Sequence, residues 1–466
     1  MKQFWKTGLA FLVLVGLGLY IWHFEWGQEI ASDDPKETIL SVEPDQATAI
    51  SIASSDAPTI RLSKVEGAWR VTSPFEAPAD QSAVESILTR LEKLEAEEVV
   101  VEEADDVAQY GLDSPSRSVS VTLEGAGEPM VVEFGAAAPG GSAVYARTPT
   151  SPRVYTVEAF VESSFEKEPF DLRDRDLLHA KRDDVRTLEV RGPEGDYALA
   201  RTDAGDWAFT EPLATRAGRW SVDGLLGTLE NLEMEAVAEE EAGDLTPFGL
   251  DRPGRSVRLV LADGTARTLE IGSPAGDKDD GKFHVREKGS SLVAIVPGAI
   301  VTDLEKGMDA LRAKKLLEVA TYDTEGFDVV SEGGAETYQK ATTEGEDGFD
   351  ETQWRRTSPE EAELETTTVE DALFKISGVE VLEFRDEPSD LESYGLDAPS
   401  VRVTIRAKGE SWIELGERDG THYARRSADD SVLVLDSTKA RELLDALDAL
   451  RAVPLQEPEP ESSPED

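Results

Sequence analysis

A six-residue motif occurs three times in this chain and constrains its fold more than any other feature. The glycine of each copy follows an acidic stretch that can form one helical turn, so it stands where a left-handed residue ends a helix. The proline then stops any helix and starts an extended segment. We interpret the motif as a structural corner whose aspartate bonds local backbone. The copies are Tyr110-Gly111-Leu112-Asp113-Ser114-Pro115, Phe248-Gly249-Leu250-Asp251-Arg252-Pro253 and Tyr394-Gly395-Leu396-Asp397-Ala398-Pro399.

The repeat extends well beyond this corner. A tryptophan precedes the motif glycine by 42 residues (69 to 111), 42 (207 to 249) and 41 (354 to 395). A repeat of about 140 residues has the size of a whole small domain. We therefore predict three similar domains. The other recurring elements are the pairs Trp69 and Pro74, Trp207 and Pro212, and Trp354 and Pro359, and the runs Val132-Glu133-Phe134-Gly135, Leu269-Glu270-Ile271-Gly272 and Ile413-Glu414-Leu415-Gly416.

An arginine closes the next short run in each copy, at Arg147, Arg286 and Arg425. A recurring arginine could hold an anion or a carboxylate of a partner, so these three residues are the candidate binding contacts. The alternative, which we favour, is a salt bridge to one of the many acidic residues of the same domain.

Each domain is predicted to combine strands with one long helix. Alternating apolar residues after each corner indicate strands joined by short turns. This order favours an α+β fold with mainly antiparallel sheet. We expect domains at residues 46–180, 181–318 and 319–453, and a disordered acidic tail at 454–466. The apolar face of the predicted helix consists of Val84, Ile87, Leu88, Leu91 and Leu94 in the first copy, Val222, Leu225, Leu226, Leu229 and Leu232 in the second, and Val369, Leu373 and Ile376 in the third.

The N-terminus is predicted to be a single membrane anchor. Residues 7–24 carry no charge, and as a helix they reach about 27 Å, close to the thickness of a bilayer core. Lysines precede this run and acidic residues follow it, so residues 1–26 comprise a cytoplasmic N-terminus and the span, and the rest lies across the membrane. A cleaved signal peptide is the alternative. Residues 27–45 are expected to form a polar stalk.

The formal net charge of −49 disfavours nucleic acid and anionic lipid surfaces as partners, because both would repel the chain. The chain has no cysteine and only four histidines, so thiol chemistry is excluded and a centre of several histidines is not expected. Residues 277–281 resemble half of a calcium loop, but a surface turn is the favoured interpretation. No phosphate, dinucleotide or nucleophile motif is present. We predict no catalytic residues, no metal and no cofactor.

The corner, the strand that ends in glycine and the N-terminal anchor together resemble the bacterial domain of unknown function 4340 family over roughly residues 46 to 453. Tandem units of this family often lie beside ABC-transporter subunits of the gliding-motility type. The resemblance implies a non-enzymatic accessory, scaffold or binding subunit of such an envelope complex. The expected location is the bacterial inner membrane, with the bulk of the chain in the periplasm and transporter-like subunits as partners. The alternatives are an envelope glycan-binding protein or carboxylate-based hydrolase, and a passive structural spacer.

Overall fold

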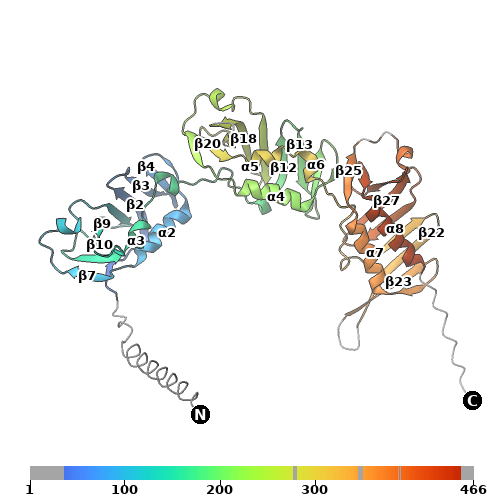
Figure 1. Ribbon diagram of the computed structural model, residues 1–466, viewed down its shortest axis with the longest axis horizontal. Helices are drawn as coiled ribbons and strands as arrows, with labels where there is room; N and C mark the ends of the chain where they lie inside the picture. The colour runs from blue at the N-terminus through green and yellow to red at the C-terminus, as the bar shows by residue number, and fades with distance from the viewer. Residues whose placement is uncertain (1–35, 277–280, 345–349, 387, 389, 453–466) are drawn as a thin grey trace, which may run out of the picture. The chain divides into compact units, whose positions relative to one another are not determined.

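The computed structural model describes the whole chain except residues 1–35, 277–280, 345–349, 387, 389 and 453–466 (Figure 1). The chain divides into two compact units, one that ends at Arg175 and one that begins at Asp176. Within the described residues, the first unit contains one nine-stranded sheet and the second unit contains two. All strand pairs in the described residues are antiparallel, so the prediction of three repeated domains with mainly antiparallel sheet is confirmed.

The three sheets share one strand order. In each sheet, the first strand in chain order lies beside the strand that follows the corner. The first sheet runs β5 (Ala77–Pro78), β4 (Ala68–Ser73), β3 (Ile60–Val65), β2 (Ala47–Ser54), β8 (Arg117–Leu123), β9 (Met130–Ala137), β10 (Ala143–Arg147), β11 (Val154–Glu158) and β7 (Glu98–Val101). The second runs β15 (Thr215–Arg216), β14 (Trp207–Glu211), β13 (Tyr197–Arg201), β12 (Val185–Arg191), β17 (Arg255–Leu261), β18 (Ala266–Ala275), β19 (Lys282–Glu287), β20 (Val293–Pro297) and β16 (Ala236–Glu239). The third runs β24 (Ala362–Leu364), β23 (Asp350–Ser358), β22 (Gly334–Glu344), β21 (Gly326–Ser331), β26 (Val401–Arg406), β27 (Glu410–Arg418), β28 (Thr421–Arg426), β29 (Val432–Leu435) and β25 (Val381–Arg385).

Helices in the described residues are few and short. α2 (Gln81–Glu92), α4 (Arg219–Glu230) and α7 (Thr366–Gly378) occupy the predicted position in each repeat, but they have only 12, 12 and 13 residues. Their buried faces include the predicted Val84, Val222 and Val369. The longest described helix, of 15 residues, is α8 (Ser437–Arg451), which packs beside α7 on the third sheet only (Figure 1). The remaining short helices are α3 (Ala159–Ser163), α5 (Ala299–Leu304) and α6 (Gly307–Leu311).

Each core lies between the helix and one face of the sheet. In the first repeat, Leu88 and Leu91 of α2 pack with Ile50, Val119 and Phe134 from three neighbouring strands, and all five side chains are buried. These strand residues alternate with partly exposed ones, because successive side chains point to opposite faces of a sheet. The opposite face of each sheet has no core helix among the described residues, and we call it the open face.

The predicted stalk is wrong for the residues from Thr38 onward. β1 (Thr38–Leu40) pairs with β6 (Leu94–Glu95), and Leu40 and Val42 are buried. This segment reads as polar because it carries few apolar residues, yet those few complete the core beneath α2. The structure therefore assigns the end of the predicted stalk to the first domain.

The same pairing recurs at the start of the other repeats, through bridges between Asp176 and Glu233 and between Lys315 and Glu380. The second and third repeats thus begin a few residues before the predicted borders at 181 and 319. No helix in the described part of the chain is long and apolar enough to cross a membrane. The predicted anchor at 7–24 and the predicted tail at 454–466 lie outside the described residues.

Candidate functional site

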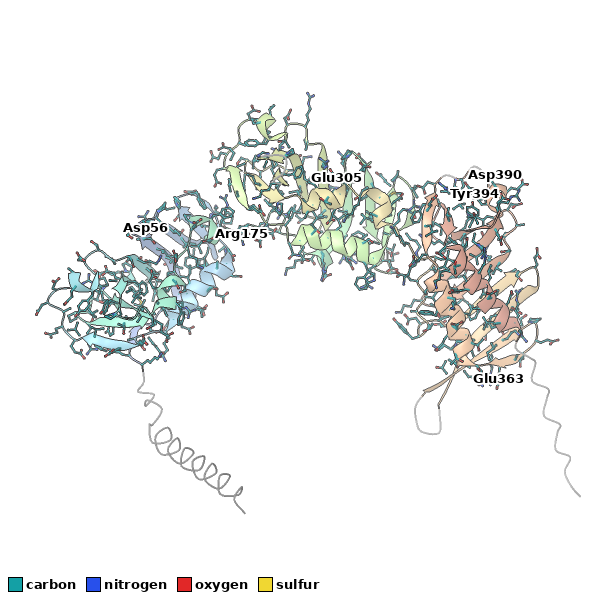
Figure 2. All side chains as sticks on the ribbon, viewed as in Figure 1. Asp56, Arg175, Glu305, Glu363, Asp390 and Tyr394 are labelled. Carbon is teal, nitrogen blue, oxygen red and sulfur yellow. The ribbon has the colours of Figure 1, made fainter. Side chains whose placement is uncertain are left out.

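The three corners have the same backbone geometry. A 3₁₀ turn ends at Gly111, Gly249 or Gly395, and these glycines have left-handed φ angles of 69°, 66° and 64°. The leucine that follows each glycine is buried, so the chain folds back onto its own domain. Figure 2 labels Asp390 and Tyr394 at the third corner. The corner therefore redirects the chain into β8, β17 or β26.

A second glycine allows the corner to lie against the sheet. A Cβ atom on Gly135 or Gly272 would lie well under 3.0 Å from a carbonyl oxygen of the corner, that of Tyr110 or Phe248. Gly416 meets the corner of the third repeat in the same way. The close backbone approach explains why the corner and the glycine-ended strand occur together. The aromatic residue of each motif also packs edge-on against a ring on the strand that follows the glycine-ended strand. The pairs are Tyr110 with Tyr145, Phe248 with His284 and Tyr394 with Tyr423.

The motif aspartates do not make the predicted local hydrogen bonds. Asp113, Asp251 and Asp397 are exposed, and no hydrogen bond to their side chains is found in the described structure. The carboxylates of Asp106, Asp244 and Asp390 instead accept backbone N–H bonds at 2.9 Å at the start of each 3₁₀ turn. The hydrogen bond from Thr246 lowers the pKa of the Asp244 carboxyl below its usual value. The local backbone hydrogen bonds are thus made by an aspartate seven positions before the motif aspartate (106 to 113, 244 to 251, 390 to 397).

The three candidate arginines lie on the open faces and pair with the glutamate of the glycine-ended strand. Arg147 contacts Glu133 and Arg286 contacts Glu270, each with 2.7 Å between Nε and Oε2. Arg425 is 3.8 Å from Glu414. Glu270 and Glu414 are almost buried, so the arginine compensates a carboxylate that water hardly reaches. The sequence offered this signal, since the glutamate recurs in all three copies.

A cluster of buried charges joins the two sheets of the second unit. Arg312 follows α6 at the end of the second repeat, and its side chain is completely buried. Its Nη1 donates to both carboxylate oxygens of Asp386 at 2.9 and 3.2 Å, and its Nη2 donates to Ser431 at 2.6 Å and to Thr215 at 3.3 Å. The ring centroid of Phe384 lies 3.7 Å from the guanidinium carbon. An arginine of the second repeat is therefore bound by Asp386, Ser431 and Phe384 of the third.

The third repeat holds the connecting segment with a second buried arginine. Arg426, at the end of β28, donates to the backbone carbonyls of Ala313 at 3.1 Å and Lys315 at 2.5 Å. Asp429 is completely buried and balances Arg426 at 2.7 Å. Burial lowers the pKa of the Arg426 guanidinium, and Asp429 opposes that shift. We call Arg312, Arg426, Asp386 and Asp429 the junction cluster.

Sequence reasoning did not identify the junction cluster. The available signal is a leucine-arginine pair at the end of every repeat, at Leu172-Arg173, Leu311-Arg312 and Leu450-Arg451. The leucine is buried in all three copies. The partners of the arginine could not be read from this pattern, because they come from segments distant in the sequence.

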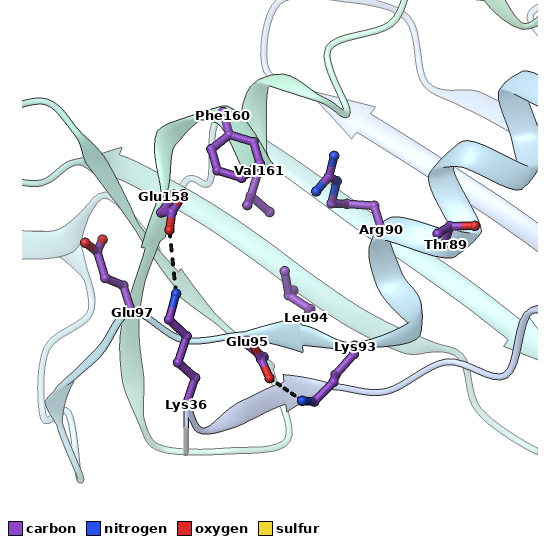
Figure 3. Close-up of a pocket in the computed structure, with 10 residues that line it drawn as sticks. All are labelled: Lys36, Thr89, Arg90, Lys93, Leu94, Glu95, Glu97, Glu158, Phe160 and Val161. Carbon is purple, nitrogen blue, oxygen red and sulfur yellow. Dashed lines mark ion pairs between the residues drawn. The ribbon is translucent and has the colours of Figure 1, made fainter. Parts of the chain in front are cut away.

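The first unit contains a hollow of about 200 Å³ near the C-terminal end of α2 (Figure 3). The guanidinium of Arg90 lies 5.3 Å from the centre of the half-exposed Phe160 ring. The same helical position is Thr228 in α4, which donates to Asp303, and Lys375 in α7, which pairs with Glu442. This position therefore connects the helix to the later helix of its repeat. Two ion pairs line the hollow, Lys36 with Glu158 and Lys93 with Glu95.

The described residues contain no group of three or more His, Asp or Glu side chains that could hold a metal ion. His284 and His422 are not equivalent, because His284 takes the place of Tyr145 and His422 lies one residue earlier in its repeat. His422 is buried with its Nε2 3.7 Å from Glu417. The predicted surface turn at 277–281 lies outside the described residues except for Gly281.

The profile of the family described as Domain of unknown function (DUF4340) matches this chain three times, at residues 69–217, 207–390 and 354–462. The chain belongs to the DUF4340 family. Each match begins at the recurring tryptophan, at Trp69, Trp207 or Trp354, so the family profile starts within the sheet at β4, β14 or β23. The tandem repeats of the DUF4340 chain are thus shown both by the family matches and by the three sheets.

No curated protein matches the chain. Among solved structures, the DNA polymerase III subunit beta of Pseudomonas aeruginosa aligns at 8% identity and a TM-score of 0.15, over 85% of this chain and 94% of its own. A DNA polymerase sliding clamp with ligand from the same organism aligns at 7% identity and a TM-score of 0.16, over 85% and 92%. These TM-scores are too low to support any argument about fold or function.

Proposed function

We propose that this DUF4340 chain is a membrane-anchored extracytoplasmic scaffold or binding subunit of an ABC-transporter-like or motility-related envelope complex. Residues 7–24 form the anchor in this proposal, with the N-terminus in the cytoplasm and the three domains in the periplasm of a bacterial cell. The long helix predicted for each domain is not part of the proposal, since the surfaces that matter are sheet faces.

The junction cluster is the observation that carries the proposal. Burying two arginines and an aspartate costs desolvation energy that apolar residues would not cost. A buried ion pair instead fixes one geometry, because a shift of either sheet would leave a charge unpaired. The second and third repeats are thus built to present their surfaces in a constant relation to each other, which is what a scaffold requires.

The binding surfaces are better sought on the open faces than on the sheet edges. One edge strand of each sheet, β7, β16 or β25, carries a register shift and an acidic side chain. Both features oppose the addition of a further strand. The open faces instead present partly exposed side chains on a rigid sheet, and this favours recognition by side chains.

Co-purification tests the scaffold. The full chain, tagged at its C-terminus, is extracted from membranes in mild detergent and its stoichiometric partners are identified. We expect integral membrane subunits of a transporter-like complex. Recovery of the chain alone would contradict the proposal and would favour the passive spacer.

Single-cysteine labelling tests the topology, because the chain has no cysteine of its own. Ala204→Cys lies in an exposed turn, and a membrane-impermeant maleimide should label it in spheroplasts. Gln3→Cys should be labelled only after the membrane is opened. Equal labelling of both variants in intact spheroplasts would contradict the orientation.

The hydrolase alternative has less support from the geometry. The three recurring glutamates of the open faces are each paired with arginine. Each of these carboxylates is thus engaged by a cation of its own domain, which is a structural role. The glycan-binding alternative is tested by the same co-purification, in which glycan rather than protein would be recovered.

A further inference from the structure

The open face of the third sheet differs from the other two at the recurring arginine-glutamate pair. The residue opposite the glutamate on the neighbouring strand is Ser118 in the first repeat, Ser256 in the second and Arg402 in the third. Two residues before the glutamate stand Val131, Thr268 and Trp412. The third repeat has therefore gained an arginine and a tryptophan at one place on the same scaffold.

The added arginine changes the pairing of the glutamate. Arg402 Nη1 lies 2.8 Å from one carboxylate oxygen of Glu414, and Arg425 Nη1 lies 3.8 Å from the other. In the first two repeats the arginine equivalent to Arg425 is 2.7 Å from its glutamate. No hydrogen bond of the Arg425 guanidinium is found among the described residues. Two guanidinium groups thus share one carboxylate, and Arg425 keeps donors for another acceptor.

Trp412 brings the two arginines together on an apolar base. The guanidinium carbons of Arg402 and Arg425 lie 4.9 and 5.8 Å from the centre of its ring. Arg402 and Arg425 are 44% and 35% exposed, so both groups reach solvent. Val330 lies opposite Arg402 on β21 and is 47% exposed. Cations and apolar surface are therefore adjacent and accessible.

We propose that Arg402, Arg425 and Trp412 bind a carboxylate side chain of a partner protein, next to an apolar residue of the same partner. The cluster carries an excess positive charge on a chain whose net charge is −49, so it is a local exception to a surface that repels acidic groups. Arginine pairs with a carboxylate through two parallel hydrogen bonds. Tryptophan and arginine are also the residues enriched at the energetic centre of protein interfaces. This inference rests on the proposed scaffold function.

An open sheet face favours a protein ligand over a small molecule. Small molecules are mostly enclosed in concave pockets, whereas the cluster spans the adjacent strands β26, β27 and β28 of one sheet. A partner can cover such a surface with its own apolar residues and exclude water from the ion pair. The partner segment is therefore acidic and apolar in close alternation.

The test uses the full chain labelled with fluorotryptophan, which places a fluorine probe at each of the eight tryptophans. Trp412→Phe assigns the signal of Trp412. The probe is a short peptide that alternates glutamate and phenylalanine, and a lysine-phenylalanine peptide is its control. We expect only the glutamate peptide to shift the Trp412 signal saturably.

Two matched variants on β26 decide whether the cluster is responsible. Arg402→Ser restores the residue of the other repeats and frees Glu414 for Arg425, so we expect affinity at least about tenfold weaker. Arg406→Ser removes the same charge from the same strand, but Arg406 is paired with Asp328 and should change affinity less than about twofold.

Three results would overturn the inference. They are an absence of saturable shift, an equal loss in both variants, and a shift that inorganic phosphate or sodium chloride of the same ionic strength reproduces. Partner recovery by co-purification that survives Arg402→Ser would reject this site while leaving the scaffold function intact.

Discussion

Arg312 and Asp386 belong to successive repeats, yet the guanidinium of one donates two hydrogen bonds to the carboxylate of the other. Arg312 has no exposed side-chain surface, and its Nε has no hydrogen-bond partner among the described atoms. Burying Arg312 therefore has a desolvation cost that its ion pair with Asp386 and its hydrogen bonds to Ser431 and Thr215 offset. This contact holds the second and third repeats together, so they are not two independent domains joined by a linker.

Arg312→Ala should destabilise the second unit by about 3 kcal/mol. It removes the positive charge that lies next to the buried Asp429 and Arg426, and it opens a cavity at Phe384. The second and third repeats should then unfold in separate transitions. Urea unfolding followed by tryptophan fluorescence measures both effects.

Arg451→Ala is the matched control, since Arg451 ends the third repeat as Arg312 ends the second. Arg451 pairs with Glu336 of its own domain at 2.9 Å and is 23% exposed. Its loss should cost about 1 kcal/mol and leave the coupling of the repeats unchanged. An equal effect of the two variants would show that the junction has no special role.

Gly272→Ala should destabilise the second repeat by about 2–3 kcal/mol, because the new methyl group would collide with the carbonyl oxygen of Phe248. Gly224→Ala lies in the exposed middle of α4, where no atom is within 4 Å of the added carbon. It should stabilise the chain by about 1 kcal/mol. Thermal unfolding of both variants gives the comparison, and effects of the same sign would refute it.

Arg286→Ala should cost about 2 kcal/mol, since it leaves the nearly buried carboxylate of Glu270 without its charged donor. Arg258→Ala on the same open face should cost less than about 1 kcal/mol, because Arg258 and Glu189 are both well exposed. Equilibrium unfolding in urea distinguishes the two. A larger loss for Arg258→Ala would mean that burial does not determine the strength of these pairs.

Alkaline pH should destabilise the second repeat through Tyr197. Burial raises the pKa of the Tyr197 hydroxyl from 10.0 to about 12. The contribution is complete below pH 10.0, and it is lost between pH 10.0 and about 12 because the unfolded chain releases the proton first. The loss over this range is about 3 kcal/mol.

Tyr197→Phe tests this pH dependence. The Tyr197 hydroxyl has no described hydrogen-bond partner, so the variant should be as stable as the parent at pH 8 and less sensitive to pH above 10. Unfolding free energies measured across this range would give the two slopes. Identical slopes would exclude Tyr197 as the source.

Local features could be predicted from the sequence because their causes are local. The left-handed glycines follow from the residues on either side of Gly111, Gly249 and Gly395, and the buried face of α4 follows from the spacing of Val222 and Leu226. Strand pairing was predicted only as a class. β2 pairs with β8 through residues such as Ile50 and Val121, and no local signal specifies that register.

The errors have the same physical origin. Three of the side chains that accept hydrogen bonds from Arg312 lie 74, 97 and 119 residues away, so a repeat pattern can reveal the arginine but not its site. Leu40 was assigned to a stalk because its neighbours are polar, whereas its burial depends on β6 more than fifty residues later. The local backbone hydrogen bonds that we predict for the motif aspartates are made by a second recurring aspartate.

The placement of Arg312 has a practical consequence for anyone who divides this chain into fragments. A cut at the sequence border between the second and third repeats would leave Arg312 on one piece and Asp386 on the other. The first piece would then expose an arginine that the intact chain buries, and the second would leave Asp386 and the buried Asp429 without it, so both would tend to associate or aggregate. Expression, crystallisation and gene rearrangement should therefore treat these two repeats as indivisible.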